Sequence, residues 1–233
     1  MKRLAIFVEG QTEQQFVSKM LREIAGEKNI AIDELRWALS RKGNRCFTVI
    51  TASAKTADQK YYVLIYDCGG DSTVKTDIVD NYDGLAKNSY EKIIGLRDVY
   101  PLSSADIPAL EYRLKFRVPT KPVPVDMLLA IMEIEAWFLA ETTHFLKIHP
   151  ALTVGRISTH LNFDPTTQNV EERVCPADDL NSIYHLERFA YNKRKSNCQR
   201  TIDALEYGAL YFDLPKKINS LRRFIQSIDS FLS

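Results

Sequence analysis

The chain has 233 residues, which is enough for one large domain or for a domain with a substantial appendage. Hydrophobic residues make up 45% of it and charged residues 26%, an ordinary balance for a globular protein. The formal net charge is +1, so no overall field attracts nucleic acid and any basic surface must be local.

The sequence given contains no segment that we expect to enter a membrane. The apolar run after Arg3 is short and ends at Glu9, unlike the apolar region of a signal peptide. No stretch approaches the roughly 20 apolar residues of a membrane span. The cysteines form no CxxC pair, which argues against a zinc site and favours reduced thiols. We therefore expect a cytoplasmic protein without membrane contact.

The first strand is predicted at residues 4–8, where a continuous apolar run is typical of a strand buried on both faces of a parallel sheet. It ends at Glu9, and a helix is predicted directly after it. Thr12 and Gln15 have the spacing of a capping box at the start of that helix. Glu9 is thus expected at the carboxyl edge of the sheet, where α/β proteins bind ligands.

Further elements alternate between strand and helix. A hairpin is predicted around the basic segment 41–44. We expect strands at 34–39, 46–51, 61–66, 92–96 and 122–131, and helices at about 73–91 and 106–117. This alternation predicts an α/β fold, with a largely parallel sheet flanked by helices and right-handed crossovers.

Beyond about residue 141 the pattern becomes helical. We expect helices at 152–161, 180–191 and 199–207, and a last helix that starts at Pro215 and carries a clear apolar stripe. The predicted organisation is an α/β domain at 1–140 and a C-terminal helical appendage at 141–233 that packs on it.

Acidic residues follow several of the predicted strands. They are Glu9, Asp67, Asp98, Glu133 and Glu135. Acids at the ends of parallel strands converge on one edge, and neighbouring carboxylates are costly unless a cation neutralises them. The pattern therefore predicts a hard divalent ion, Mg²⁺ or Mn²⁺. Glu133 and Glu135 point to opposite sides of a strand and lie about 200° apart on a helix, so one of them is expected to be structural.

The segment after the 61–66 strand is Asp67-Cys68-Gly69-Gly70-Asp71. Its glycines would let a phosphate or a metal approach the backbone closely. The alternative is a tight turn with Asp71 capping the following helix, and for Asp71 we favour that alternative. For Asp67 both interpretations stay open.

The segment Val8-Glu9-Gly10-Gln11-Thr12-Glu13 resembles the opening motif of TOPRIM domains. That metal-binding fold is shared by topoisomerases, primases and nucleases of the overcoming-lysogenization-defect family. The chain is also similar to small TOPRIM-like proteins that accompany bacterial anti-phage genes, which carry a run like Glu133-Ile134-Glu135-Ala136-Trp137. The resemblance implies a TOPRIM-like fold, with Glu9 as a metal ligand or general acid/base in phosphodiester chemistry.

The chain departs from the TOPRIM pattern at its second element. That pattern has an Asp-x-Asp strand end in which both aspartates bind metal, whereas this chain has Asp98-Val99-Tyr100. Asp98 keeps the ligand role that the resemblance implies. Tyr100 would be a poor Mg²⁺ ligand, which argues against a full two-metal mechanism. Glu133 or Glu135 would then supply the missing carboxylate.

Basic residues gather locally. The candidates for contact with nucleic acid are Lys193, Arg194, Lys195, Arg200, Arg113 and Arg117, the last two one turn apart on a predicted helix. The alternative is a solvated charged face.

Together these features predict a Mg²⁺-dependent endonuclease acting on DNA or RNA, with Glu9 and Asp98 as catalytic residues. Related systems imply an anti-phage effector with a separate ATPase partner, and a homo-oligomer is compatible with this. One alternative is a non-catalytic partner subunit of an ATPase-containing complex, which Tyr100 favours. Another is a nucleotide-binding α/β protein using residues 68–71, although these lack the usual glycine spacing. The sequence has no GxxxxGK[ST] motif, so we expect no ATP hydrolysis by the chain itself.

Overall fold

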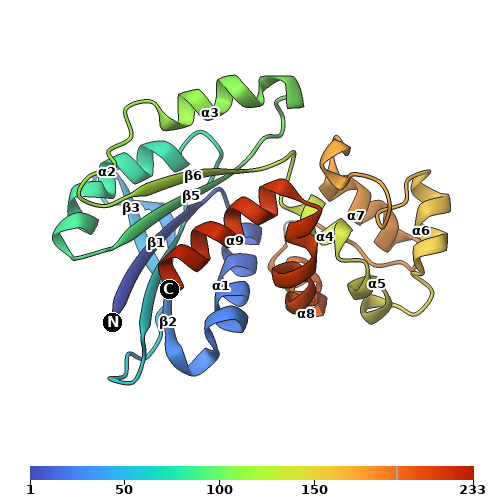
Figure 1. The fold of residues 1–233 in the computed structure, drawn as a ribbon, viewed down its shortest axis with the longest axis horizontal. Coiled ribbons are helices and arrows are strands. Elements are labelled where there is room, and N and C mark those ends of the chain that lie inside the picture. The colour runs from blue at the N-terminus through green and yellow to red at the C-terminus, as the bar shows by residue number, and fades with distance from the viewer. Residues whose placement is uncertain (193) are drawn as a thin grey trace. The chain divides into compact units, whose positions relative to one another are not determined.

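The computed structural model describes residues 1–192 and 194–233, and Figure 1 shows their course. The strands are β1 (Lys2–Val8), β2 (Ile30–Leu39), β3 (Arg45–Thr51), β4 (Tyr61–Asp67), β5 (Lys92–Asp98) and β6 (Val125–Ala130). The α-helices are α1 (Gln11–Ala25), α2 (Val74–Lys87), α3 (Ile107–Lys115), α4 (Glu135–Ala140), α5 (Thr143–Ile148), α6 (Val154–Leu161), α7 (Pro176–His185), α8 (Lys195–Ala204) and α9 (Asn219–Leu232). Short helical turns are η1 (Glu27–Asn29), η2 (Ser104–Asp106), η3 (Val170–Glu172), η4 (Ala209–Asp213) and η5 (Leu214–Lys216).

Within the described residues the strands form one six-stranded sheet in the order β3-β2-β4-β1-β5-β6. β2, β4, β1 and β5 pair in parallel, and β3 pairs with β2 in antiparallel fashion as the predicted hairpin. β6 runs parallel to β5, because hydrogen bonds from Ile93 N to Pro124 O and from Val99 N to Ala130 O advance along both segments together. The predicted α/β fold with a largely parallel sheet is confirmed.

Helices cover the sheet on both faces. The chain passes from β1 over β4 to β2, and from β4 over β1 to β5, which are opposite directions across the sheet. Right-handed crossovers therefore place α1 and α2 on opposite faces. α1 packs on β2 and β4, and α2 packs on β1. We call these two sides the α1 face and the α2 face.

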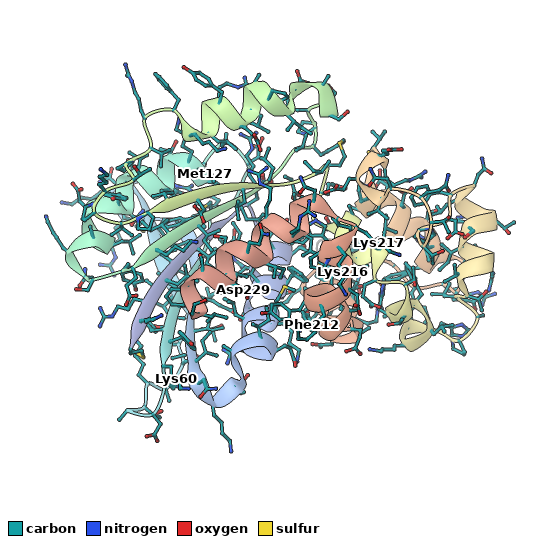
Figure 2. The ribbon with its side chains drawn as sticks, viewed as in Figure 1. Lys60, Met127, Phe212, Lys216, Lys217 and Asp229 are labelled. Carbon is teal, nitrogen blue, oxygen red and sulfur yellow. The ribbon has the colours of Figure 1, made fainter. Side chains whose placement is uncertain are left out.

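The core lies along β1. Residues 4–8 have no exposed surface, which confirms a strand buried on both faces. On the neighbouring strand, Gly95 is closely packed. A Cβ atom at Gly95 would lie 2.7 Å from Ile78 Cδ1 of α2 and 2.9 Å from Met127 Sδ, and Figure 2 labels Met127 on β6. A larger residue there would force the ends of the Ile78 and Met127 side chains to shift.

The described chain separates into two compact units. The sheet unit contains Met1–Arg97, Pro108–Leu129 and Gln226–Ser233, and the helical unit contains Asp98–Ile107 and Ala130–Ile225. The sequence predicted a division after residue 140, whereas in the structure the end of α9 belongs to the sheet unit. Tyr61 Oη donates to Leu232 O at 2.6 Å, and Lys2 Nζ donates to Phe231 O at 3.4 Å.

Two predicted helix starts are wrong. α1 begins at Gln11 with Gly10 as its N-cap and no side-chain cap, so Thr12 lies inside the first turn and the capping box does not form. α9 begins at Asn219, because Pro215 belongs to the separate turn η5. Across residues 1–192 and 194–233, no helix has the length and apolar character that a membrane crossing needs.

Candidate active site at the carboxyl edge of the sheet

The carboxyl ends of β4 and β1 lie at the same level in the sheet. Val8 pairs with Asp67, and Phe7 pairs with Gly95 on the other side of β1. Glu9 is the first residue after β1 and Arg97 lies two residues beyond Gly95, so both occupy this edge. The predicted position of Glu9 at the carboxyl edge is confirmed by this register.

Arg97 gathers two carboxylates in the sheet unit. Its Nη2 donates to Asp71 Oδ2 at 2.9 Å, and its Nε lies 3.8 Å from Glu9 Oε1. The Arg97 side chain is 13% exposed and that of Glu9 16%, so both charges are largely withdrawn from water. Arg97 Nε is buried and has no hydrogen-bond partner among the described residues. A guanidinium thus supplies positive charge beside Glu9 and Asp71.

Residues 71–73 form a turn, as the favoured interpretation of Asp71 expects, but Asp71 does not cap α2, so that part of the prediction is wrong. The N-cap of α2 is Thr73, and no side chain caps the helix there. Asp71 instead accepts from Ser72 N through Oδ1 and from Arg97 through Oδ2. Sequence reasoning also missed Arg97, although its position directly before Asp98 at a strand end was a usable signal.

Asp67 is held by its neighbours. Its carboxylate accepts from Arg36 Nε at 2.8 Å and from Gly69 N at 3.0 Å, and its side chain is 6% exposed. Arg36 also donates to Gln11 Oε1 at 3.0 Å, which ties β2 to the start of α1. Asp67 therefore orders the segment after β4, and its charge is balanced by a guanidinium.

Asp98 is the last residue of β5 and is grouped with the helical unit. It is buried, and its Oδ1 accepts from Ile134 N at 3.1 Å. Tyr100 N donates to Met132 O at 2.8 Å, so the backbone after β5 runs beside the segment after β6. Here Asp98 fixes the conformation of the chain before α4.

Glu133 and Glu135 have separate surroundings in the helical unit. Glu133 Oε2 accepts from Ala177 N, in the first turn of α7, at 2.9 Å. Glu135 is buried and its Oε1 accepts from Tyr191 Oη at 2.7 Å. The two side chains therefore have different partners, and the expectation that one of them is structural stays a prediction.

The predicted nucleic-acid residues also have individual surroundings. Lys193 lies outside the described residues. Arg194 and Lys195 are exposed at the start of α8. Arg200 packs over the ring of Phe189, with 5.0 Å between its Cζ and the ring centroid, and donates to Ala190 O.

Arg113 and Arg117 are both exposed, but they are not one turn apart on a helix. α3 ends at Lys115, and Arg117 follows it with a φ of 58°. That part of the prediction is wrong, because the helix ends before the second arginine.

The donor chemistry at the edge fits a hard divalent ion only in part. Glu9 and Asp71 both lie near the Arg97 guanidinium and offer carboxylate oxygens, which are the ligands that such an ion prefers. However, within the described part of the chain, no group of three or more His, Cys, Asp or Glu side chains is arranged to hold a metal. An ion bound here would take over the role that the Arg97 guanidinium has now.

A family model described as "Domain of unknown function (DUF4276)" matches residues 8–203. The chain belongs to the DUF4276 family. The matched region of this DUF4276 protein includes Glu9, Asp67, Asp71, Arg97 and Asp98.

Among curated proteins, none matches the chain. Among solved structures, a hypothetical protein from Pyrococcus horikoshii OT3 is 16% identical with a TM-score of 0.44, over 98% of this chain and 96% of that one. A protein from Lactobacillus plantarum WCFS1, described as a "putative cell surface hydrolase", is 10% identical with a TM-score of 0.34, over 88% of this chain and 98% of that one.

Proposed function

We propose that this DUF4276 protein is a TOPRIM-like, metal-dependent nuclease that hydrolyses phosphodiester bonds in DNA or RNA. The observation that carries the proposal is the cluster of Glu9, Asp71 and Arg97 at the carboxyl edge of the parallel strands. This edge is where open α/β sheets place their ligands. A carboxylate beside an arginine combines a group that can hold a cation or a proton with one that binds phosphate oxygens.

In this proposal the carboxylates and the arginine of the cluster have different roles. Glu9 and Asp71 would hold Mg²⁺ or Mn²⁺, which supplies Lewis-acid stabilisation of the phosphate when bound. Glu9 follows the rigid, fully buried strand β1, so its carboxylate is well positioned to accept or return a proton. Arg97 would then be free to contact a phosphate oxygen of the substrate. Asp67, Asp98, Glu133 and Glu135 stay predictions as ligands.

The test is cleavage of supercoiled plasmid and of tRNA with Mg²⁺, with Mn²⁺ and with EDTA. Glu9→Gln keeps the shape of the side chain and removes its charge, so we expect cleavage to fall at least 100-fold while the fold is kept, as circular dichroism would show. Asp98→Asn tests the second predicted catalytic residue in the same assay. Glu91→Gln, at an exposed position before β5, is the matched control and should cleave normally. Full cleavage by Glu9→Gln would refute the assignment.

The second candidate is a non-catalytic TOPRIM-like partner subunit. The observation that favours it is that arginines, Arg36 and Arg97, pair with Asp67 and Asp71, which leaves less negative charge for a metal. Tyr100 in place of an aspartate points the same way. Calorimetric titration with Mn²⁺ separates the two candidates: a nuclease shows a site that disappears in Glu9→Gln, and a scaffold shows none.

The biological setting is part of the same proposal. We infer an anti-phage effector in the cytoplasm that acts with a separate ATPase subunit, as the TOPRIM-like resemblance implies. Phage plating on cells that express the wild-type chain or Glu9→Gln tests this setting. Equal phage yields in all strains would contradict it.

A further inference from the structure

A cavity of about 430 Å³ opens on the α2 face of the sheet unit, away from the cluster around Glu9. Residues from β1, β4, α2, the 52–60 loop and the turn after α2 line it, among them Tyr62, Leu64, Tyr66, Tyr90, Arg3 and Lys55. This volume lies within the range of small-ligand sites, roughly 300–1,000 Å³. The proposed function makes no use of it.

The cavity exists because α2 covers only part of this face. α2 packs on β1, so the neighbouring strand β4 is covered less completely. Leu64 in the middle of β4 is accordingly half-buried, whereas Val63 and Ile65, which point to the α1 face, have no exposed surface. On the helix side, a Cβ atom at Gly84 would meet nothing within 4 Å. The space between Leu64 and Gly84 is therefore open.

Phenol rings form the ends of the cavity. Tyr62 and Tyr90 have ring centroids 6.5 Å apart, and Tyr62 Oη donates to Asp33 Oδ2 at 2.6 Å. Toward the other end of β4, Tyr66 is stacked on Phe7 with a centroid separation of 4.2 Å. These packed rings give the cavity rigid, partly apolar walls suited to a flat aromatic group.

Two cations flank the Tyr62 end. Lys55 Nζ lies 4.0 Å from the centroid of the Tyr62 ring, and Arg3 is the residue paired with Tyr62 in the sheet. Arg3 also donates to Asn88 O at 2.8 Å, which holds it at the rim. Asp33 is the acid at this end, 3.3 Å from Lys55, so the two cations outnumber it. An anionic group is favoured there.

We propose that this cavity binds a nucleoside phosphate. The base would lie between Leu64 and Gly84, and the phosphate would lie between Arg3 and Lys55. Asn81 and Asn88 also line the cavity, and each donates through Nδ2 to the backbone carbonyl four residues earlier, so their amide oxygens would accept from the edge of the base. The ligand would be a free nucleotide or one nucleotide of a single strand, because the recognised chemistry is the same.

The test is isothermal titration in EDTA with AMP, GMP, CMP and UMP, and with RNA and DNA trinucleotides. Adenosine and inorganic phosphate are titrated as the separate halves. We expect one site per chain for at least one nucleotide, and at least tenfold weaker binding of either half. Arg3→Gln and Lys55→Gln should each weaken binding about tenfold, the effect of losing one charge-assisted contact.

Gly84→Leu adds a side chain at a cavity-lining position where a Cβ atom would meet nothing within 4 Å, and it replaces a helical glycine with a better helix former, so this variant should fold at least as well as the wild type. It should abolish binding. Gly155→Leu, at a helical glycine in α6 that also has open space, and Lys60→Gln, at an exposed lysine outside the cavity lining (Figure 2), are the matched controls and should bind normally.

The outcomes separate the sources of the ligand. Binding of a mononucleotide that Gly84→Leu abolishes identifies a free nucleotide, and binding confined to a trinucleotide that Gly84→Leu abolishes identifies a strand. Binding that survives in Gly84→Leu, or no binding of any probe at millimolar concentration, overturns the proposal. The readout needs neither metal nor cleavage, so Glu9→Gln should bind as the wild type does, whatever its nuclease activity.

Discussion

Single charged residues decide the chemistry of the sheet edge. Arg97 is largely buried between Glu9 and Asp71, so its guanidinium compensates two carboxylates that would otherwise repel each other. The same place would suit a divalent ion, because both cations are held by carboxylate oxygens. The site can therefore act in catalysis only if the Arg97 guanidinium moves aside and a divalent ion binds between Glu9 and Asp71.

Replacing Arg97 tests this exchange. We expect Arg97→Gln to lower the free energy of unfolding by about 1–3 kcal/mol, because the hydrogen bond to Asp71 and the positive charge near Glu9 are both lost. If the carboxylates bind Mg²⁺, 10 mM Mg²⁺ should restore much of that loss through ligand binding to the folded state. Urea unfolding with and without Mg²⁺ measures both effects.

Arg113→Gln is the matched control for Arg97→Gln, since its side chain is exposed on α3. It should change stability by less than about 0.5 kcal/mol. If Arg97→Gln loses stability and Mg²⁺ does not restore it, the non-catalytic partner subunit is favoured over the nuclease.

A second residue, Glu141, organises the helical unit. It is buried and accepts hydrogen bonds from Thr143 N and Oγ1, from His144 N and from Glu206 N. Burial acts to raise the pKa of Glu141, but hydrogen bonds from His144 and Thr143 outweigh burial and lower that pKa below its ordinary value. The ionised carboxylate is thus part of the folded structure.

The lowered pKa of Glu141 predicts a loss of stability in acid. The unfolded state binds this proton at a higher pH, about 4.3, so the stabilisation is complete above that pH and is lost as the pH falls through the lower pKa of the folded state. Glu141→Gln should lower the free energy of unfolding by about 1–3 kcal/mol at pH 7 and by less near pH 3. Urea unfolding across pH 3–7 checks this, with Glu23→Gln on the exposed side of α1 as a nearly neutral control. An equal loss at all pH values would contradict it.

At the scale of elements, the β2–β3 hairpin is fastened to the segment after β4. Arg45 on β3 pairs with Asp77 of α2 through two hydrogen bonds of 2.7 and 2.6 Å, and it also donates to Cys68 O. Trp37 on β2 lies directly over Gly69, where an added Cβ atom would be 1.7 Å from Trp37 Nε1. Gly69 also has a φ of 69°, so both its conformation and its surroundings require glycine. These contacts hold the Asp67–Asp71 segment in place.

Gly43 and Gly69, which both have a positive φ, separate the effect of backbone strain from the effect of the contact with Trp37. Gly43→Ala, at the hairpin tip with a φ of 77° and open space, should cost about 1–2 kcal/mol of stability from backbone strain alone. Gly69→Ala should cost about 1–3 kcal/mol more, because Trp37 must move. Urea unfolding measures both losses of stability. Equal losses would show that Trp37 moves aside without a cost in free energy.

At the scale of the whole molecule, the order of residues along the chain differs from their grouping in space. The last residues, Gln226–Ser233, belong with the strands near the start of the chain. Phe231 is 3% exposed and lies against Tyr61, with ring centroids 5.6 Å apart. The sheet unit therefore needs the end of α9 to close its α1 face.

Removing residues 226–233 should weaken the sheet unit selectively. We expect amide hydrogen exchange in β1 and β4 to accelerate at least tenfold, because Phe231 and its neighbours no longer cover those strands. Exchange in α7 and α8 is the internal control and should change little. Unchanged protection in β1 and β4 would show that the tail is dispensable.

The sequence determined the elements whose signal is local. The apolar run 4–8 gave a doubly buried strand, the alternation of strand and helix gave a parallel α/β sheet, and Glu9 fell at its carboxyl edge because β1 ends at Val8. What the tertiary structure alone decided is which charges meet. Arg97 with Glu9 and Asp71, Arg36 with Asp67, and Arg3 beside Tyr62 come from segments far apart in the chain. Strand order and register bring them together, and no local pattern of residues encodes either property.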